Sequence, residues 1–334
     1  MSKGIRRFES SRFRQEEFDN IPSGIFFYAS CLQKVGDTYY NKHRMFDFHN
    51  HYTNWIQAGS DFSGLINAMD MVGVEKVAIC GLPTIPLDGH YAIDTKTDSN
   101  LLGQYEKLSD DYKRRIFPFV CGINPENPMA VRYVKNLLSI YPSSIFGIGE
   151  VLCRHDTMSM KIFGKEIPPN TPTMLELSDL ATEYGLPILL HSNVAKSGDV
   201  EPVYLAEIEE LLAHNRETKI VWAHCGISKD INNIPLSLLL DTLEQMFLKY
   251  KNLYVDLSWR VFDYYIENNE EEWSQLIEKY PERFLLGTDH TGKWEEYSAT
   301  VHRYDILNDL LSERSRNMVK NENAEMIIPN SVKV

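Results

Sequence analysis

The sequence has few cysteines, and they form no motif. There are five, an odd number, and none belongs to a Cys-x-x-Cys pair: Cys31, Cys80, Cys121, Cys153 and Cys225. This wide spacing argues against a disulfide framework and against a thiolate zinc site. We therefore expect a protein of a reducing compartment, namely the cytoplasm.

The sequence also lacks long apolar runs and stretches rich in lysine and arginine. The N-terminal region is charged, without the apolar core of a secretory signal, and no later segment reaches membrane-spanning length. The formal net charge of -13 would repel a nucleic-acid backbone unless a local basic face intervened. We expect a small-molecule substrate and no nucleic-acid or membrane partner, and we leave a homo-oligomer open.

Apolar residues are plentiful and fall in short β-rich runs. They make up 43% of the chain, which is enough for a sizeable core. Helical segments separate the runs, a pattern typical of repeated βα units around a parallel sheet. Eight strands that alternate with helices predict a (β/α)8 TIM barrel. The predicted strands are residues 44–49, 75–81, 115–121, 145–151, 187–191, 219–225, 252–257 and 283–289.

A doubly wound open sheet is the alternative architecture. It usually carries a glycine-rich phosphate loop after its first strand, where this chain has His-Asn-His instead. We predict one barrel over residues 44–334 that ends in a C-terminal helix, with residues 1–43 as an N-terminal extension packed on it. Long connections at 82–100 and 152–172 follow strand ends, so we expect them to overhang the active site.

His49 and His51 follow a mostly apolar run that reads as a buried strand. Residues i and i+2 of a strand point to the same side, so the two imidazoles can bind one cation. Two nearby histidines are more often ordinary surface or core residues, which makes the pair weak evidence by itself. Potential ligands recur, however, at the ends of four further apolar runs: Glu150, His191, His224 and Asp289.

The C-terminal ends of all strands in a (β/α)8 barrel open on one mouth, so these six residues should meet. Each has a structural alternative: Glu150 could be a salt-bridged acid, for example with Arg154, and the histidines could be hydrogen-bonded core residues. We predict that all six bind metal. His224 could instead be an electrophile that polarises a substrate oxygen. Oxygen and imidazole donors suit zinc, or manganese, nickel or iron.

This donor set predicts metal-assisted hydrolysis. A divalent cation would lower the pKa of a bound water and polarise the scissile carbonyl or phosphoryl oxygen. Asp289, at the end of the last strand and so beside the first-strand pair, is our predicted general base. The sequence contains no serine nucleophile elbow, no P-loop and no evident activated cysteine that would offer a competing chemistry.

These residues resemble those of the amidohydrolase superfamily, specifically the amidohydrolase-related group that also contains non-oxidative decarboxylases. The resemblance implies that His49, His51 and Asp289 bind a first metal. It also implies that His191 and His224 bind a second metal or divide between ligand and catalyst, with Glu150 as the bridge. Many relatives have a carboxylated lysine at that fourth-strand position, and a glutamate there resembles the TatD-like nucleases and some amidohydrolase-related proteins. The matching segments are 47–51, 150, 188–191, 221–224, 287–289 and, more loosely, 323–324.

We predict a metal-dependent hydrolase that cleaves an amide, ester or lactone bond in a small organic molecule with one or two divalent ions, zinc first among them. The alternatives are a zinc-dependent decarboxylase of a small carboxylic acid, a TatD-like phosphodiesterase or DNase, and a non-catalytic ligand-binding barrel. The acidic charge balance opposes the nuclease. The complete ligand set opposes the non-catalytic barrel.

Residues that contact the substrate are expected just beyond the ligand-bearing strand ends. Arg154 or Arg260 could hold a substrate carboxylate bidentately, and Trp259 is a further candidate. Ordinary salt bridges or packing would explain these side chains equally well. The full set of candidates is Tyr52, Trp55, Arg154, His155, Asn193, Trp259, Arg260 and His290.

Overall fold

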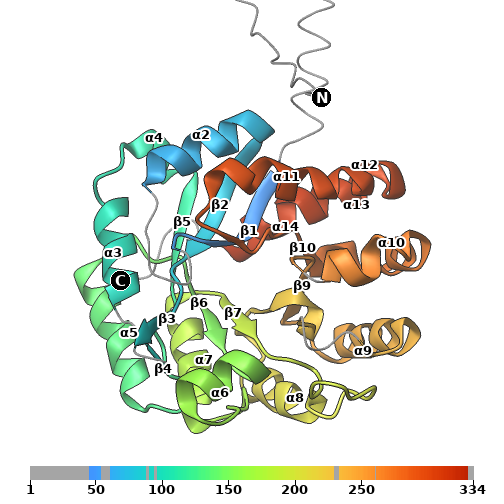
Figure 1. The fold of residues 1–334 in the computed structure, drawn as a ribbon, viewed down its shortest axis with the longest axis horizontal. Helices are drawn as coiled ribbons and strands as arrows, with labels where there is room; N and C mark the ends of the chain where they lie inside the picture. Colours follow the sequence, from blue (N-terminus) through green and yellow to red (C-terminus); the bar gives the residue numbers. More distant parts are fainter. Residues whose placement is uncertain are drawn as a thin grey trace, which may run out of the picture. The chain divides into compact units, whose positions relative to one another are not determined.

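The computed structural model describes residues 45–53, 61–87, 90–93, 96–228, 233–259 and 261–329. Within them, parallel strands lie at the centre and helices surround them (Figure 1). The predicted N-terminal extension, residues 1–43, lies outside the described residues, so it stays a prediction. Among the described helices, none has the length and apolar character needed to cross a membrane.

The central sheet follows the order of the chain almost completely. Its neighbouring strands are β10-β9-β8-β7-β6-β5-β2-β1-β11, and every pair is parallel. The strand bounds are β1 (Met45–His51), β2 (Val74–Cys80), β5 (Ile116–Val120), β6 (Gly147–Leu152), β7 (Ile188–His191), β8 (Ile220–Trp222), β9 (Leu253–Asp256), β10 (Phe284–Leu285) and β11 (His290–Thr291).

The barrel closes through its last strand, which is divided into two pieces. The first piece, β10, pairs with β9, and the second piece, β11, pairs with β1. Between them the N–H of Phe48 donates to the carbonyl of Leu286 at 2.8 Å. β10 and β11 therefore act as one eighth strand that joins the two edges of the sheet. The predicted (β/α)8 barrel is confirmed.

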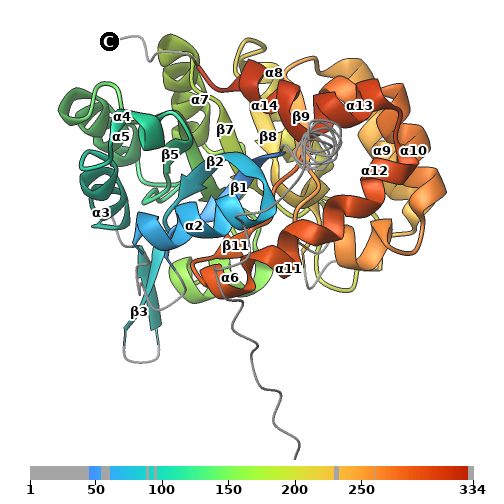
Figure 2. The same cartoon turned by 90° about the horizontal axis from the view of Figure 1, so that it is seen from above.

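Helices cover the outside of the strands (Figure 2). Several have caps that the sequence encodes: Asp61 accepts a hydrogen bond from the N–H of Gly64, and Thr171 accepts one from Met174. The main helices are α2 (Phe62–Val72), α3 (Lys96–Tyr105), α5 (Met129–Ile140), α7 (Pro172–Tyr184), α8 (Leu205–His214), α9 (Leu236–Lys249) and α10 (Glu270–Lys279), with the short α4 (Asp110–Lys113) before β5. The C-terminal region adds α11 (Tyr297–His302), α12 (Leu307–Leu310), α13 (Glu313–Asn317), η6 (Met318–Glu322) and α14 (Asn323–Ile327).

Two apolar layers hold the barrel together. Phe46, Phe48 and Phe119 belong to the cluster inside the barrel, where Phe48 and Phe119 make an edge-to-face contact with ring centroids 5.7 Å apart. Ala324 and Ile327 of α14 belong to the same cluster. α14 lies at the end of the barrel opposite to β11 (Figure 2), so this helix closes the N-terminal end. The outer layer is the larger one and lies between strands and helices.

The long connections at 82–100 and 152–172 contain secondary structure that we did not predict. The first forms an antiparallel hairpin of β3 (Thr84–Leu87) and β4 (His90–Ile93). The second contains α6 (Asp156–Phe163), and β4 contacts α6. Both lie toward the end of the barrel that carries β11 (Figure 2), the side on which we expected them.

Lys320 of η6 is a buried cation that lowers stability at neutral pH. Its Nζ donates to Asn308 at 3.1 Å, yet burial lowers the pKa of the amine from 10.5 to about 8. A lowered amine pKa means that the fold loses stability as the pH falls through about 8. Lys320→Met is therefore expected to raise the free energy of unfolding at pH 7 by about 1–3 kcal/mol, and the gain should vanish near pH 10.5.

Denaturant unfolding at several pH values checks this prediction. The exposed Lys165, whose side chain is 60% accessible, provides the control variant Lys165→Met, for which no pH-dependent gain is expected. A Lys320→Met protein that is less stable than the parent at pH 7 would contradict the argument.

Candidate metal centre

The two histidines of β1 face the barrel interior because the strand is irregular there. In a regular strand Phe48 and His49 would point to opposite sides. The register with β2 shifts between Asp47 and Asn50, and this bulge lets both Phe48 and His49 face inward. His51 follows two positions later on the same side as His49, as predicted, and its Nδ1 donates to the carbonyl of Gly81 at 2.9 Å. In the neutral ring of His51 the lone pair is therefore on Nε2, which faces Asp289 at 3.0 Å.

Glu150 lies between the β1 histidines and two others. Its Oε2 is 3.7 Å from the Nε2 of His49 and 3.6 Å from that of His51. Its Oε1 is 2.9 Å from the Nδ1 of His191 and 3.4 Å from the Nε2 of His224. The two oxygens of one carboxylate therefore face two pairs of imidazoles, an arrangement suited to a bridging ligand.

Gly149 permits this placement of Glu150. The backbone of β6 approaches the adjacent strand β7 closely at this position. A Cβ on Gly149 would come within 2.2 Å of the carbonyl oxygen of Leu189, and its φ of 131° disfavours other residues. The register between β6 and β7 also shifts here, between Ile148 and Val151. As at His49, the ligand candidate lies at an irregular point in its strand.

Asp289 lies in the turn that divides the eighth strand. Its backbone φ is 52°, and its N–H donates to the carbonyl of His49 at 2.7 Å. Asp47, on the other side of β1, fixes this turn because its carboxylate accepts from the N–H of Thr288 at 2.8 Å and from the hydroxyl at 2.7 Å. The Oδ1 of Asp289 is 3.0 Å from the Nε2 of His51 and 3.6 Å from that of His49. Its side chain is 17% exposed, whereas that of His49 is fully buried, so Asp289 is the group most open to solvent.

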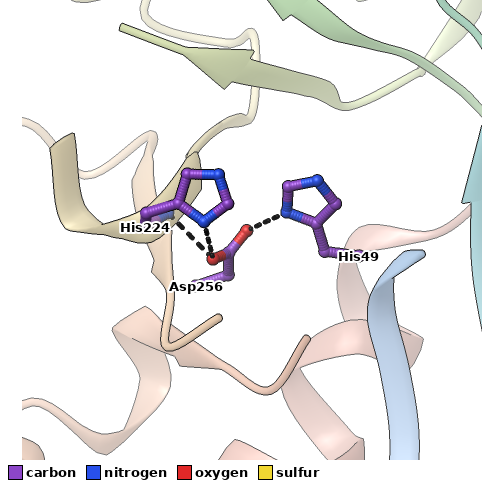
Figure 3. Close-up of side chains that lie close together, drawn as sticks. All are labelled: His49, His224 and Asp256. Carbon is purple, nitrogen blue, oxygen red and sulfur yellow. Dashed lines mark hydrogen bonds and ion pairs between the residues drawn. The ribbon is translucent and has the colours of Figure 1, made fainter. Parts of the chain in front are cut away.

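Asp256, at the end of β9, is part of the centre and was missed in the sequence. Its carboxylate lies between His49 and His224 (Figure 3), with Oδ2 at 2.9 Å from the Nδ1 of His49. The other oxygen, Oδ1, accepts from the backbone N–H of His224 at 2.9 Å. It also accepts from both the N–H and the hydroxyl of Ser258. The signal was present, because Asp256 ends one of the eight predicted strands just as the other candidates do.

Charges at the centre compensate one another. Burial would lower the pKa of His49, but Asp256, Glu150 and Asp289 outweigh it and raise that pKa well above the ordinary value. Burial would raise the pKa of Asp256, but His49 and His224 bring it down to about 2. Glu150 and Asp289 likewise have lowered pKa values because the surrounding histidines outweigh burial. The acids are therefore ionised at neutral pH and present negative charge to any bound cation.

The donor atoms fit a divalent ion. Zinc ligands lie about 2.1 Å from the ion, which puts tetrahedral donors about 3.4 Å apart. The contacts that join His49, His51, Glu150 and Asp289 fall in this range, between 3.0 and 3.7 Å. The Nε2 atoms of His49 and His191 are buried and have no hydrogen-bond partner in the described part of the chain. An unpartnered buried donor or acceptor is costly, and a bound cation would remove that cost. The groups that could hold an ion are His49-His51-Asp289, Glu150-His191-His224 and His49-His224-Asp256.

A family model described as amidohydrolase matches residues 163–329, which is half of the chain. The chain belongs to the amidohydrolase family. The resemblance found in the sequence is thereby confirmed, and the protein is a member of an enzyme family. None of the curated proteins matches this chain in sequence.

Solved structures similar to this amidohydrolase share its fold at low sequence identity. A putative 2-pyrone-4,6-dicarboxylic acid hydrolase from Pseudomonas putida has a TM-score of 0.58 and 14% identity, over 85% of this chain and 97% of that one. An amidohydrolase from Burkholderia multivorans with bound zinc has a TM-score of 0.59 and 12% identity, over 86% and 100%. A 2,6-dihydroxybenzoate decarboxylase from Rhizobium has a TM-score of 0.54 and 11% identity, over 85% and 98%. This group includes both hydrolases and a decarboxylase, so the fold does not choose between the two reactions.

The candidate substrate residues of this amidohydrolase differ in their surroundings. The ring of Trp259 lies edge-on to His224, with centroids 5.2 Å apart, and the ring of His155 stacks on His191 at 4.4 Å. The amide of Asn193 is buried without a hydrogen-bond partner among the described residues. Arg260 and Trp55 lie outside the described residues.

Arg154 is held by two acids. Its guanidinium donates to Glu166 at 2.9 Å and to both carboxylate oxygens of Glu207, and it stacks on the ring of Tyr204 at 3.9 Å. We did not predict these partners, although salt bridging was the structural alternative for this residue. The network joins the start of the 152–172 connection to α8.

Arg154→Ala is expected to lower the free energy of unfolding by about 1–3 kcal/mol, because it leaves the partly buried carboxylates of Glu166 and Glu207 without their cationic partner. Chemical denaturation measures this, and the matched variant Arg114→Ala, which removes an exposed pair with Asp111, should change stability little. A raised KM with unchanged stability in Arg154→Ala would instead support the substrate role that the sequence indicated.

Proposed function

We propose that this amidohydrolase family member is a metal-dependent hydrolase that cleaves an amide, ester or lactone bond in a small organic molecule. The observation that carries the proposal is the convergence of His49, His51, Glu150 and Asp289. They come from three strands, yet the contacts that join them are 3.7 Å or shorter. Without a cation this arrangement buries two carboxylates and leaves the Nε2 of His49 without a hydrogen-bond partner among the described residues, which is costly.

We propose that the first metal position is formed by His49, His51 and Asp289. A second position would be formed by His191 and His224, with Glu150 between the two. Family membership and the potential ligand groups support a divalent ion, and we propose zinc because imidazole and carboxylate donors suit it. Such an ion would supply Lewis acidity, which acidifies water and polarises a substrate oxygen.

Side chains around the first metal position would transfer protons and contact the substrate. Asp289 is ionised, lies at the most accessible edge of the ligand ring and can accept a proton from water and return it to the leaving group. His224 lies within 3.9 Å of Asp289 and within 3.4 Å of Glu150, so it can bind metal or contact a substrate oxygen. Trp259 beside His224 would provide an apolar wall for the substrate.

A decarboxylase is the second candidate. A 2,6-dihydroxybenzoate decarboxylase is among the solved structures with this fold. Decarboxylation would use the same ligand ring with a carboxylic acid as the substrate. The nuclease alternative has less support, because the net charge of -13 opposes a phosphodiester backbone.

The test begins with elemental analysis of the purified full-length protein, for which we expect one or two equivalents of a divalent metal. The metal-loaded protein is then assayed against amides, esters, lactones, phosphodiesters, single-stranded DNA and aromatic carboxylic acids. Hydrolysis of a carbonyl substrate that stops on chelation supports the proposal. Release of carbon dioxide from an acid would establish the decarboxylase instead, and DNA cleavage would establish the nuclease.

A further inference from the structure

We propose that Asp256 is a positioning residue that, together with Ser258, sets the ring tautomers of His49 and His224 so that both histidines present an Nε2 lone pair to the metal centre. The proposal rests on the proposed metal centre. It assigns a role to Asp256, whose carboxylate lies between His49 and His224 (Figure 3), and to Ser258, neither of which the sequence indicated as a ligand.

The first step concerns His49. Its Nδ1 is 2.9 Å from the Oδ2 of Asp256, and an ionised carboxylate can only accept a hydrogen bond. The proton of the neutral ring must therefore be on Nδ1, which leaves the lone pair on Nε2. That Nε2 has no hydrogen-bond partner within the described ranges, and it faces Glu150 and Asp289.

The second step concerns His224 and passes through Ser258. The Ser258 hydroxyl makes a short hydrogen bond to the Oδ1 of Asp256, to which it must donate its only proton. The Oγ of Ser258 is 2.6 Å from the Nδ1 of His224, so this hydroxyl oxygen accepts the Nδ1 proton of that ring. The Nε2 of neutral His224 is then also unprotonated. It lies 3.4 Å from the Oε1 of Glu150.

The third step explains why Asp256 acts through the histidines and is not itself a ligand. It is fully buried, and its oxygens accept from four donors: the Nδ1 of His49, the N–H of His224, and the N–H and hydroxyl of Ser258. Three of these donors converge on Oδ1 alone. A carboxylate used in this way orients histidine rings and holds their protons on Nδ1, as outer carboxylates do for metal-bound histidines.

The isosteric variant Asp256→Asn separates charge from shape. Oδ1 faces three donors, so the amide oxygen of asparagine must take that place, and the NH2 group must face His49. The amide then donates to Nδ1 and moves the ring proton to Nε2, where it blocks binding. We expect zinc affinity, measured on the full-length protein by competition with a chelator, to fall about 10- to 100-fold.

Two further measurements keep the proposal testable if Asp256→Asn does not fold. Histidine 15N NMR on the metal-free parent chain, recorded at a pH high enough for both rings to be neutral, should report protonated Nδ1 and unprotonated Nε2 for His49 and His224. Ser258→Ala removes the acceptor for His224 and a 3.4 Å contact with the Nδ1 of His49, but it leaves the Asp256 carboxylate on His49, so it should weaken zinc binding less than Asp256→Asn does. If Asp256 were simply a ligand, Ser258→Ala would leave the affinity unchanged.

The outcomes are distinct. Unchanged zinc affinity in a folded Asp256→Asn protein would overturn the positioning role, and so would neutral rings in the parent chain that carry their proton on Nε2. Unchanged affinity in Ser258→Ala would overturn the relay to His224. These results would leave the proposed function standing, whereas a parent chain that binds no divalent cation would overturn the proposed function itself.

Discussion

Replacing His49 and His51 together with alanine is expected to yield a protein that no longer retains a divalent cation. The two rings supply two of the four donor atoms of the group formed by His49, His51, Glu150 and Asp289. In the variant only the two acids remain, and both lose the His51 ring that lies 3.6 Å or less from them in the parent protein. Zinc held by so few protein donors exchanges readily with solvent. Elemental analysis after dialysis against a chelator should show less than a tenth of the metal bound by the parent protein, a loss of about 1.4 kcal/mol or more in binding.

The control for this experiment must also remove two histidines. His214 and His302 lie on the surface, where each pairs with an aspartate, so the variant His214→Ala, His302→Ala should keep its metal. Circular dichroism establishes that both proteins fold. If the His49, His51 variant is folded and keeps the full metal content, the proposed ligand assignment is wrong.

Asp289→Asn is expected to lower kcat about 10²- to 10⁴-fold while the protein keeps its fold. Asparagine preserves the shape of the side chain, and the backbone N–H of residue 289 can still donate to the carbonyl of His49. The side-chain amide, however, cannot act as a base that accepts a proton from water. The histidines lower the pKa of Asp289, so the parent carboxylate is ionised and able to act as a base at neutral pH. The measurement is kcat and KM on the first substrate that the panel identifies, together with the metal content of each protein.

Asp309→Asn is the matched control, because Asp309 is exposed on α12 and far in sequence from any ligand candidate. It should retain the turnover of the parent. An Asp289→Asn protein with metal bound and kcat within a factor of a few of the parent would exclude Asp289 as the base. A loss confined to metal content would reassign it as a ligand only.

Much of the fold was predictable because buried parallel strands leave a clear pattern. The runs that end in Glu150 and His191 are apolar at consecutive positions, and the structure buries both faces of these strands. The β3–β4 hairpin and α6 were not predicted, because residues 82–100 and 152–172 contain several prolines and no extended apolar period. Hairpin pairing and the contact between β4 and α6 depend on tertiary neighbours.

The candidate site was predictable at the level of residue type and less so at the level of local geometry. The i, i+2 rule placed His49 and His51 on one side, but it could not show that a bulge turns His49 inward beside Phe48. Asp256 was overlooked because an acid at a strand end does not by itself distinguish a ligand from a group that orients histidines. That distinction depends on Ser258 and on the backbone of His224, and it needs coordinates.

The divided eighth strand has a consequence for how the protein matures. Gly287, Thr288 and Asp289 join β10 to β11, and a Cβ on Gly287 would come within 2.6 Å of the Cβ of His49, so this segment fits tightly against β1. During synthesis the N-terminal histidines emerge from the ribosome long before Asp289 does. The nascent chain therefore cannot form the proposed first metal position, His49-His51-Asp289, until the barrel closes, so a cation bound there would report on correct folding.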